Sequence, residues 1–171
     1  MVMNIDLKKK EEVDNRLATL CQAMGYALWE CQGLEQILAK YYSVAFTLPE
    51  RPSAEQIDSE FENNFSHTAG RLVSLLKKSA GEKEIYAARL EAFLKERNWL
   101  AHKLRRTDLL SIFSEETFNQ LTSRVSAITN EATQLTIAFN QLMIEYFVSL
   151  GVSRPHIESK LEKELSKPYN S

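Results

Sequence analysis

Arg97 and His102 are the residues of this chain whose types and spacing best suit acid–base chemistry on a phosphate. Four residues separate them, and the polar Asn98 directly follows Arg97. A histidine exchanges protons near neutral pH, and an arginine neutralises phosphate oxygens through a fork of N–H donors. This pair therefore suggests RNA cleavage without a metal ion, with His102 as proton carrier and Arg97 as phosphate clamp.

Basic residues surround this pair in a chain that is otherwise slightly acidic. The segment from Lys95 to Arg106 holds five Lys or Arg residues and one Glu, whereas the whole chain has a net charge of −2. Such a balance argues against nucleic-acid binding by the whole surface and favours one local basic patch. The residues expected to hold RNA phosphates are Lys95, Lys103, Arg105 and Arg106. The chain has nine arginines, so the bare pair is also compatible with chance, and the basic context is what favours a site.

The elements that must position this site are helices. Apolar residues recur at helical spacing along two long stretches, and no stretch alternates with the period of a strand. Ser114 is a suitable N-cap with two glutamates behind it, and Gly151 is a natural stop. The sequence predicts helices over 10–46, 54–78, 82–105, 114–150 and 154–167.

These helices predict an all-α fold, with four helices in a bundle and a short fifth. Residues 1–171 are expected to form one domain, with a core over about 10–150 and a short C-terminal helix over 153–167. Four long elements joined by short connections run alternately up and down, so the long first and fourth helices are expected to be antiparallel.

Arg97 and His102 are expected on different faces of the third helix. Arg97 falls on the apolar stripe that includes Ile85 and Phe93, where an arginine needs a charged partner or an exit to water. His102 lies about 140° further round an ideal helix, whereas Asn98 and His102, four residues apart, share a face. A shared site therefore requires Arg97 to curl toward His102, the helix to loosen near its end, or a second subunit to supply the other half.

Composition and residue spacing limit the cellular location and the cofactors that are expected for this protein. Cys21 and Cys31 lie ten residues apart in one predicted helix, too far to form a disulfide, and small buried apolar roles are expected for them. No stretch is long and apolar enough for a membrane span, and the N-terminus does not read as a signal peptide. A cytoplasmic protein is expected, with no cofactor and no metal, because the three histidines are scattered. Trp29 and Trp99 suit core or interface packing better than base stacking.

The chain resembles the HEPN-domain family in the residues Arg97, Asn98 and His102 and in the order of its helices. In that family a four- or five-helix bundle carries Arg, a polar residue and then His on its third helix, and the resemblance covers about residues 10–150. It implies a metal-independent endoribonuclease acting as a homodimer, with RNA as substrate and 2′,3′-cyclic phosphate ends as products. Leu104 stands where the toxin subgroup of toxin–antitoxin systems usually carries tyrosine.

Two further functions remain open. One is a non-catalytic helical interaction or regulatory protein that binds a partner protein, and the other is a module that binds a nucleotide in the dimer cleft. The resemblance places an RNase of this type in a toxin–antitoxin, defence or stress system, with an antitoxin or regulatory protein as partner. It also implies a dimer with the third helices near the two-fold axis.

Overall fold

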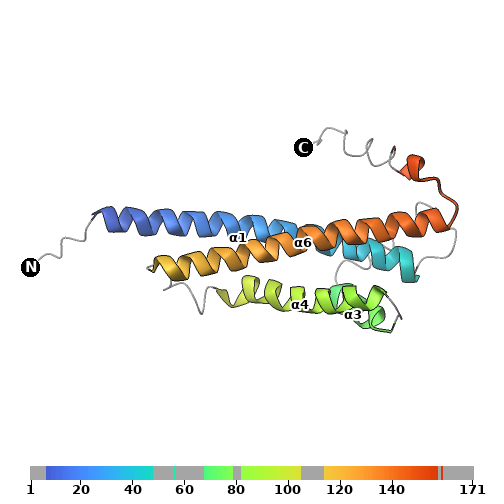
Figure 1. Cartoon of the computed structure of the whole chain (residues 1–171), viewed down its shortest axis with the longest axis horizontal. Helices are drawn as coiled ribbons and strands as arrows, with labels where there is room; N and C mark the ends of the chain where they lie inside the picture. The colour runs from blue at the N-terminus through green and yellow to red at the C-terminus, as the bar shows by residue number, and fades with distance from the viewer. Residues whose placement is uncertain are drawn as a thin grey trace, which may run out of the picture.

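A computed structural model describes residues 7–47, 56, 68–78, 82–104, 114–157 and 159 of the 171-residue chain. Within these residues the fold is all-α, without a strand, and its first and fourth long elements are helices, as expected (Figure 1). The helices are α1 (Leu7–Tyr42) with a π-helical extension η1 (Ser43–Thr47), α3 (Thr68–Leu76), α4 (Glu82–His102) and α6 (Glu115–Ser149). Within the stretches expected to form the second and fifth helices, 57–67 and 160–167 lie outside the described residues.

The expected antiparallel arrangement of the first and fourth helices is wrong, because α1 and α6 run parallel. Residues further along α1 contact residues further along α6. Arg16 lies over the Phe118 ring at 5.9 Å, and Thr133 donates a hydrogen bond to Glu30 at 3.2 Å. Further on, the Tyr41 and Phe139 ring centroids are 5.1 Å apart. Figure 1 shows α4 returning in the opposite direction beside them, while α3 is a short helix at one end.

The physical reason for this correction is the length of α3. The expected up-and-down order requires four elements that each cross the length of the bundle. The described part of the second element is nine residues long, about 14 Å at 1.5 Å per residue, so among the described helices it is α1, α4 and α6 that span the fold. Three crossings place the first and the last in the same direction.

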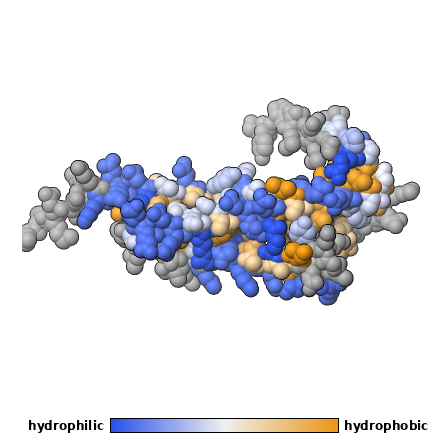
Figure 2. All heavy atoms as spheres, viewed as in Figure 1, coloured by the Kyte–Doolittle hydropathy of each residue, from blue (hydrophilic) through white to orange (hydrophobic). Residues whose placement is uncertain are grey.

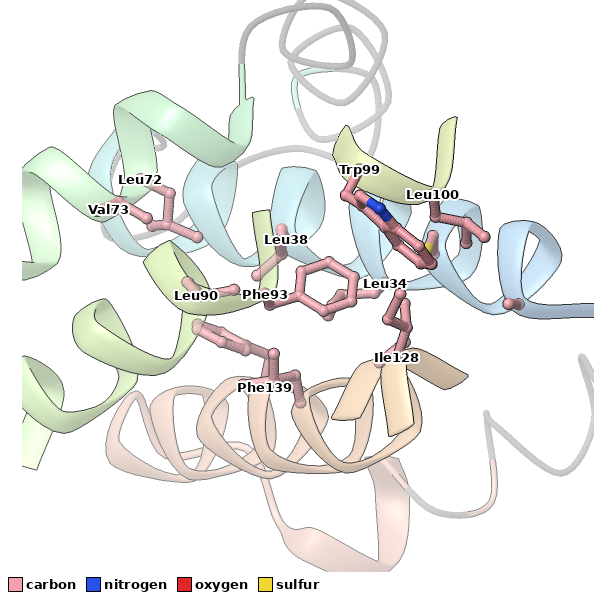
Figure 3. Close-up of a cluster of buried hydrophobic side chains, with 14 of the residues drawn as sticks. Leu34, Leu38, Leu72, Val73, Leu90, Phe93, Trp99, Leu100, Ile128 and Phe139 are labelled. Carbon is pink, nitrogen blue, oxygen red and sulfur yellow. The ribbon is translucent and has the colours of Figure 1, made fainter. Parts of the chain in front are cut away.

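One hydrophobic cluster joins all these helices. Figure 3 shows Leu34 and Leu38 of α1, Leu72 of α3, and Phe93 of α4 converging toward Phe139 of α6. Leu34, Leu38, Leu72 and Phe139 are all 0% exposed. Burial of such side chains contributes about 1.5–3 kcal/mol each and fixes how α4 sits on the α1–α6 pair.

The ends of α6 match their sequence signals. The Ser114 side chain accepts a hydrogen bond from the Thr117 N–H at 3.5 Å, and Glu115 and Glu116 occupy the first turn. Gly151 has φ 89°, a left-handed conformation that only glycine adopts without cost, and α6 ends two residues before it.

Helical spacing places Leu17 on the apolar stripe of the first helix and Ile85 and Ala101 on that of the third, but all three are exposed. Ile85 on α4 is 63% exposed, because Ala87 and Leu90 provide the buried side of that helix. Leu17 on α1 is 37% exposed. In the view of Figure 2, hydrophilic residues cover the part where α1 and α6 begin, and apolar residues gather toward the end where α6 stops.

Candidate functional site on helix α4

Lys95, Asn98 and His102 form one exposed face near the end of α4. They are three and four residues apart, which places them one above another on the helix, and all three are exposed. His102 is the last residue of α4, and the following Lys103, also exposed, donates its backbone N–H to the Trp99 carbonyl at 2.9 Å. Arg105 and Arg106 lie outside the described residues. Helix α4 thus brings a proton carrier, an amide and an ammonium group onto one accessible surface.

Arg97 points away from this face toward α1 but remains connected to it. Its guanidinium forms an ion pair with the Glu35 carboxylate of α1, and both side chains are 30% exposed. A second group of the same guanidinium, Nη1, donates to Asn98 Oδ1 at 3.2 Å. The expected need of Arg97 for a partner is therefore met by Glu35, and Asn98 joins Arg97 to the exposed face.

The five-residue offset between Arg97 and His102 is retained in the structure. Arg97 is half-buried beside α1, and His102 is exposed at the helix end. Residues 82–102 form one uninterrupted α-helix, so no local change of helical phase brings the two side chains onto one face. Arg97 and Asn98 are brought together, whereas His102 is aligned with Asn98 rather than with Arg97.

Glu35 is the member of this group that the motif did not reveal. It follows the buried Leu34 and borders the apolar stripe of α1, as Arg97 borders that of α4. An acidic residue at the edge of one helix's apolar stripe and a basic residue at the edge of another's indicate a possible ion pair between the two helices. Using that signal requires knowing that the two helices are neighbours and in which register.

Cys31 lies one turn before Glu35, and its thiol is poorly suited to nucleophilic chemistry. The side chain is 2% exposed, and burial raises the pKa of the Cys31 thiol to about 11. The positive charge of Arg97 opposes this pKa shift, whereas the negative charges of Glu35 and Glu30 add to it. Near neutral pH the thiol stays protonated, consistent with the expected apolar packing role. Cys21, expected to be buried as well, is exposed.

A groove of about 330 Å³ between α4 and α6 is spanned by two arginine–glutamate pairs. Arg89 bonds both carboxylate oxygens of Glu131 at 2.9 and 3.1 Å, and Arg124 bonds both of Glu96 at 2.7 and 3.0 Å. The Arg124 guanidinium also lies 3.6 Å from the Trp99 ring centroid. Its hydrogen bonds lower the pKa of Glu96. Because each guanidinium faces a carboxylate, this groove fastens α4 to α6 and is not a basic site.

Comparison of the chain with protein-family models, with curated proteins and with solved structures finds no match. In the described part of the chain, no cluster of three or more His, Cys, Asp or Glu is arranged to hold a metal ion. Among those same residues no helix has the length and apolar character to cross a membrane.

The two tryptophans have opposite environments. Trp99 is 8% exposed and belongs to the core cluster, as packing considerations suggested. Trp29 on α1 is 70% exposed, and the nearby Tyr26 is 60% exposed. Neither lies on the α4 face that carries His102.

Proposed function

We propose that this protein is a metal-independent endoribonuclease whose reacting groups lie at the end of α4. The observation that carries the proposal is the shared exposed face of Lys95, Asn98 and His102, with Arg97 hydrogen-bonded to Asn98 from its edge. This set offers a proton carrier, a hydrogen-bonding amide and positive charge within two helical turns, which are the groups that phosphodiester cleavage requires.

In the proposed reaction His102 accepts the proton of a ribose 2′-hydroxyl. The 2′-oxygen then bonds to the adjacent phosphorus as the bond from phosphorus to the 5′-oxygen breaks. The imidazolium of His102 or a water molecule gives a proton to the leaving 5′-oxygen. One product ends in a 2′,3′-cyclic phosphate and the other begins with a 5′-hydroxyl, so atoms and protons balance.

Arg97 can serve this reaction while paired with Glu35. A guanidinium carries five N–H donors in a fixed plane, and Glu35 and Asn98 engage different terminal nitrogens. No other acceptor among the described residues is bonded to this guanidinium, so its remaining donors can meet a phosphate, and Glu35 fixes the plane of the fork. Asn98 would orient the bound phosphate or the Arg97 fork, and Lys95, Lys103, Arg105 and Arg106 would hold flanking phosphates.

The biological setting belongs to the same proposal. A cytoplasmic role in a toxin–antitoxin, defence or stress system, with an antitoxin or regulatory protein as partner, rests on the resemblance of Arg97, Asn98 and His102 to the HEPN motif. The homodimer implied by that resemblance is likewise a proposal.

The test is cleavage of end-labelled RNA in the presence of EDTA. We expect cleavage by the unaltered protein, cyclic phosphate ends on the products, and loss of activity in His102→Ala and Arg97→Ala. His156→Ala is the matched control, because His156 is also exposed and lies beyond α6. Cleavage that depends on a divalent metal, or that survives in His102→Ala, would refute this mechanism.

A second candidate is a non-catalytic interaction protein, and one observation favours it specifically. The Arg97–Glu35 pair joins α4 to α1, which gives Arg97 a structural role without any substrate. This reading predicts no cleavage of a broad RNA panel, together with a lower melting temperature in Arg97→Ala and an unchanged one in His102→Ala.

A further inference from the structure

The outer face of α1 carries a long seam without charge. We define the outer seam as Asn15, Ala18, Gln22, Gly25, Tyr26, Trp29, Gly33 and Gln36. Apart from the adjacent Gly25 and Tyr26, these residues follow one another at intervals of three or four, the spacing of one helix face, over about 32 Å of helix. All are exposed except the half-buried Gly33, and Tyr26 and Trp29 are 60% and 70% exposed. The solvent-facing side of a surface helix normally carries charged residues, and such residues make up 26% of this chain.

The described helices leave this face uncovered. Leu34 and Ala27 point into the core, Glu35 contacts α4 through Arg97, and Glu30 contacts α6 through Thr133. At 100° per residue, Trp29 lies on the side of α1 away from all of these contacts. Exposed aromatic rings on an unpartnered face are typical of protein–protein interfaces.

Gly25 and Gly33 give an independent indication. Glycine inside a helix is unfavourable relative to alanine. Among the described glycines only Gly151 has a positive φ, so neither Gly25 nor Gly33 is required by backbone conformation. A Cβ atom built at either position meets no atom within 4 Å, so neither is required by packing within the protomer. A second helix that approaches closely would account for both.

We infer that the outer seam binds a second copy of this chain, with the two α1 helices antiparallel and the two-fold axis between Gly25 and Tyr26. In this register Tyr26 of each protomer packs over the partner's Gly25. Trp29 faces the partner's Gln22, and Gly33 faces the partner's Ala18. Large side chains thus meet small or flexible ones along the whole seam, and the contact is self-complementary, as a closed dimer requires.

Charge at the ends of the seam decides the direction. Glu11 lies four residues before Asn15, and Lys40 lies four residues after Gln36, and both are exposed. The antiparallel register places Glu11 against the partner's Lys40 at both ends. A parallel pair would place Glu11 against Glu11 and Lys40 against Lys40, which is repulsive.

This dimer is an alternative to the one centred on α4 that the resemblance implies, because a closed pair has a single two-fold axis. The exposed face of α4 carries Glu91, Lys95 and His102, and Ile85 is its one exposed large hydrophobic residue in the described stretch. Pairing through α1 leaves α4 and α6 on the sides away from the partner, so each protomer keeps its own accessible Lys95–Asn98–His102 face. The inference does not rest on the proposed RNase activity.

The test is the oligomeric state of the full chain by sedimentation velocity between about 1 and 100 µM. We expect a dimer, and at least a 100-fold rise in its dissociation constant in the Tyr26→Ala/Trp29→Ala double variant. Gly25→Leu should also dissociate the dimer while retaining helical circular dichroism. Ile85→Lys is the matched control, because it changes an exposed apolar residue on α4 and should leave the dimer intact. A monomer at every concentration, or dissociation by Ile85→Lys and not by the seam variants, would overturn the inference.

A charge exchange tests the register. Glu11→Lys and Lys40→Glu should each weaken the dimer about tenfold, and the double variant should restore it, because opposite charges meet again. Circular dichroism of each variant confirms that α1 is intact. Two single variants whose effects add in the double variant would refute the antiparallel register.

Discussion

At the residue scale the decisive contact is the ion pair between Arg97 and Glu35, because it determines how much of the guanidinium could meet the RNA phosphate of the proposed reaction. Glu35→Gln removes the carboxylate charge and keeps a group of similar shape. We expect RNA affinity at low salt to rise severalfold, and the slope of its salt dependence to steepen by about one counterion, since Arg97 then carries an uncompensated charge. Stability should fall by about 1 kcal/mol or less, because the pair is 30% exposed.

Filter binding of labelled RNA at several salt concentrations measures this effect. Glu96→Gln is the matched control, because it removes a carboxylate charge that is paired with Arg124 of α6 and not with Arg97. If both variants raise RNA affinity equally, the gain reflects net charge and not Arg97.

Cys31 makes a second prediction at this scale. Its thiol pKa of about 11 lies above the ordinary value of 9.0 because of burial, so the folded state retains a proton that the unfolded state releases. The free energy of unfolding should therefore fall as the pH rises from about 9 to 11, by at most about 1.4 kcal/mol per pH unit. Burial also raises the pKa of Tyr41 above 10.0, which adds to the loss at the upper end.

Urea unfolding at a series of pH values checks this prediction. In Cys31→Ala the decline should become shallower, and a decline of unchanged slope would exclude Cys31 as its source. Thiol reagents offer a second check at pH 8, where the exposed Cys21 should react quickly and the buried Cys31 only after denaturant is added.

At the scale of the element, the two faces of α6 differ sharply within two residues. Phe139 is 0% exposed and contacts the Tyr41 and Tyr86 rings at 5.1 and 5.6 Å, whereas Ile137 is 58% exposed. Phe139→Ala should lower the free energy of unfolding by about 3–5 kcal/mol, because it leaves a cavity among α1, α4 and α6. Ile137→Ala on the outer face should change it by no more than about 0.5 kcal/mol.

Chemical denaturation of the two variants measures this contrast. A small loss in Phe139→Ala would show that the helices repack around the cavity. A large loss in Ile137→Ala would show that another surface covers this residue.

At the scale of the whole molecule, the order in which the described helices cross the bundle makes α1 and α6 parallel. Glu30→Cys and Thr133→Cys, introduced into a background without Cys21 and Cys31, should be joined by a short bis-maleimide, because the two native side chains are hydrogen-bonded at 3.2 Å. Electrophoresis should show a faster-migrating monomer. Arg16→Cys combined with Phe118→Cys should be joined as well, because Arg16 lies over the Phe118 ring. Arg16→Cys combined with Phe147→Cys is the control and should not cross-link, because only an antiparallel pair would bring these two positions together.

The sequence determined the local features of this protein. Capping by Ser114, the acidic first turn of α6 and the stop before Gly151 depend on residues within a few positions of one another, so they were predicted correctly. The bounds of α4 were nearly correct for the same reason. The exposed alignment of Asn98 with His102 and the five-residue offset of Arg97 also follow from helical geometry alone.

Only the tertiary structure decided which helices are neighbours and in which direction they run. In the described part of the chain α1, α4 and α6 cross the bundle and the short α3 does not, which makes α1 and α6 parallel. That outcome depends on how much of a segment crosses the bundle rather than on its periodicity. The partner of Arg97 lies 62 positions away, at Glu35, and its identity depends on the register between α1 and α4. Burial was likewise decided by neighbours, which is why the spacing of Ile85 suggested a core residue although the fold leaves it exposed.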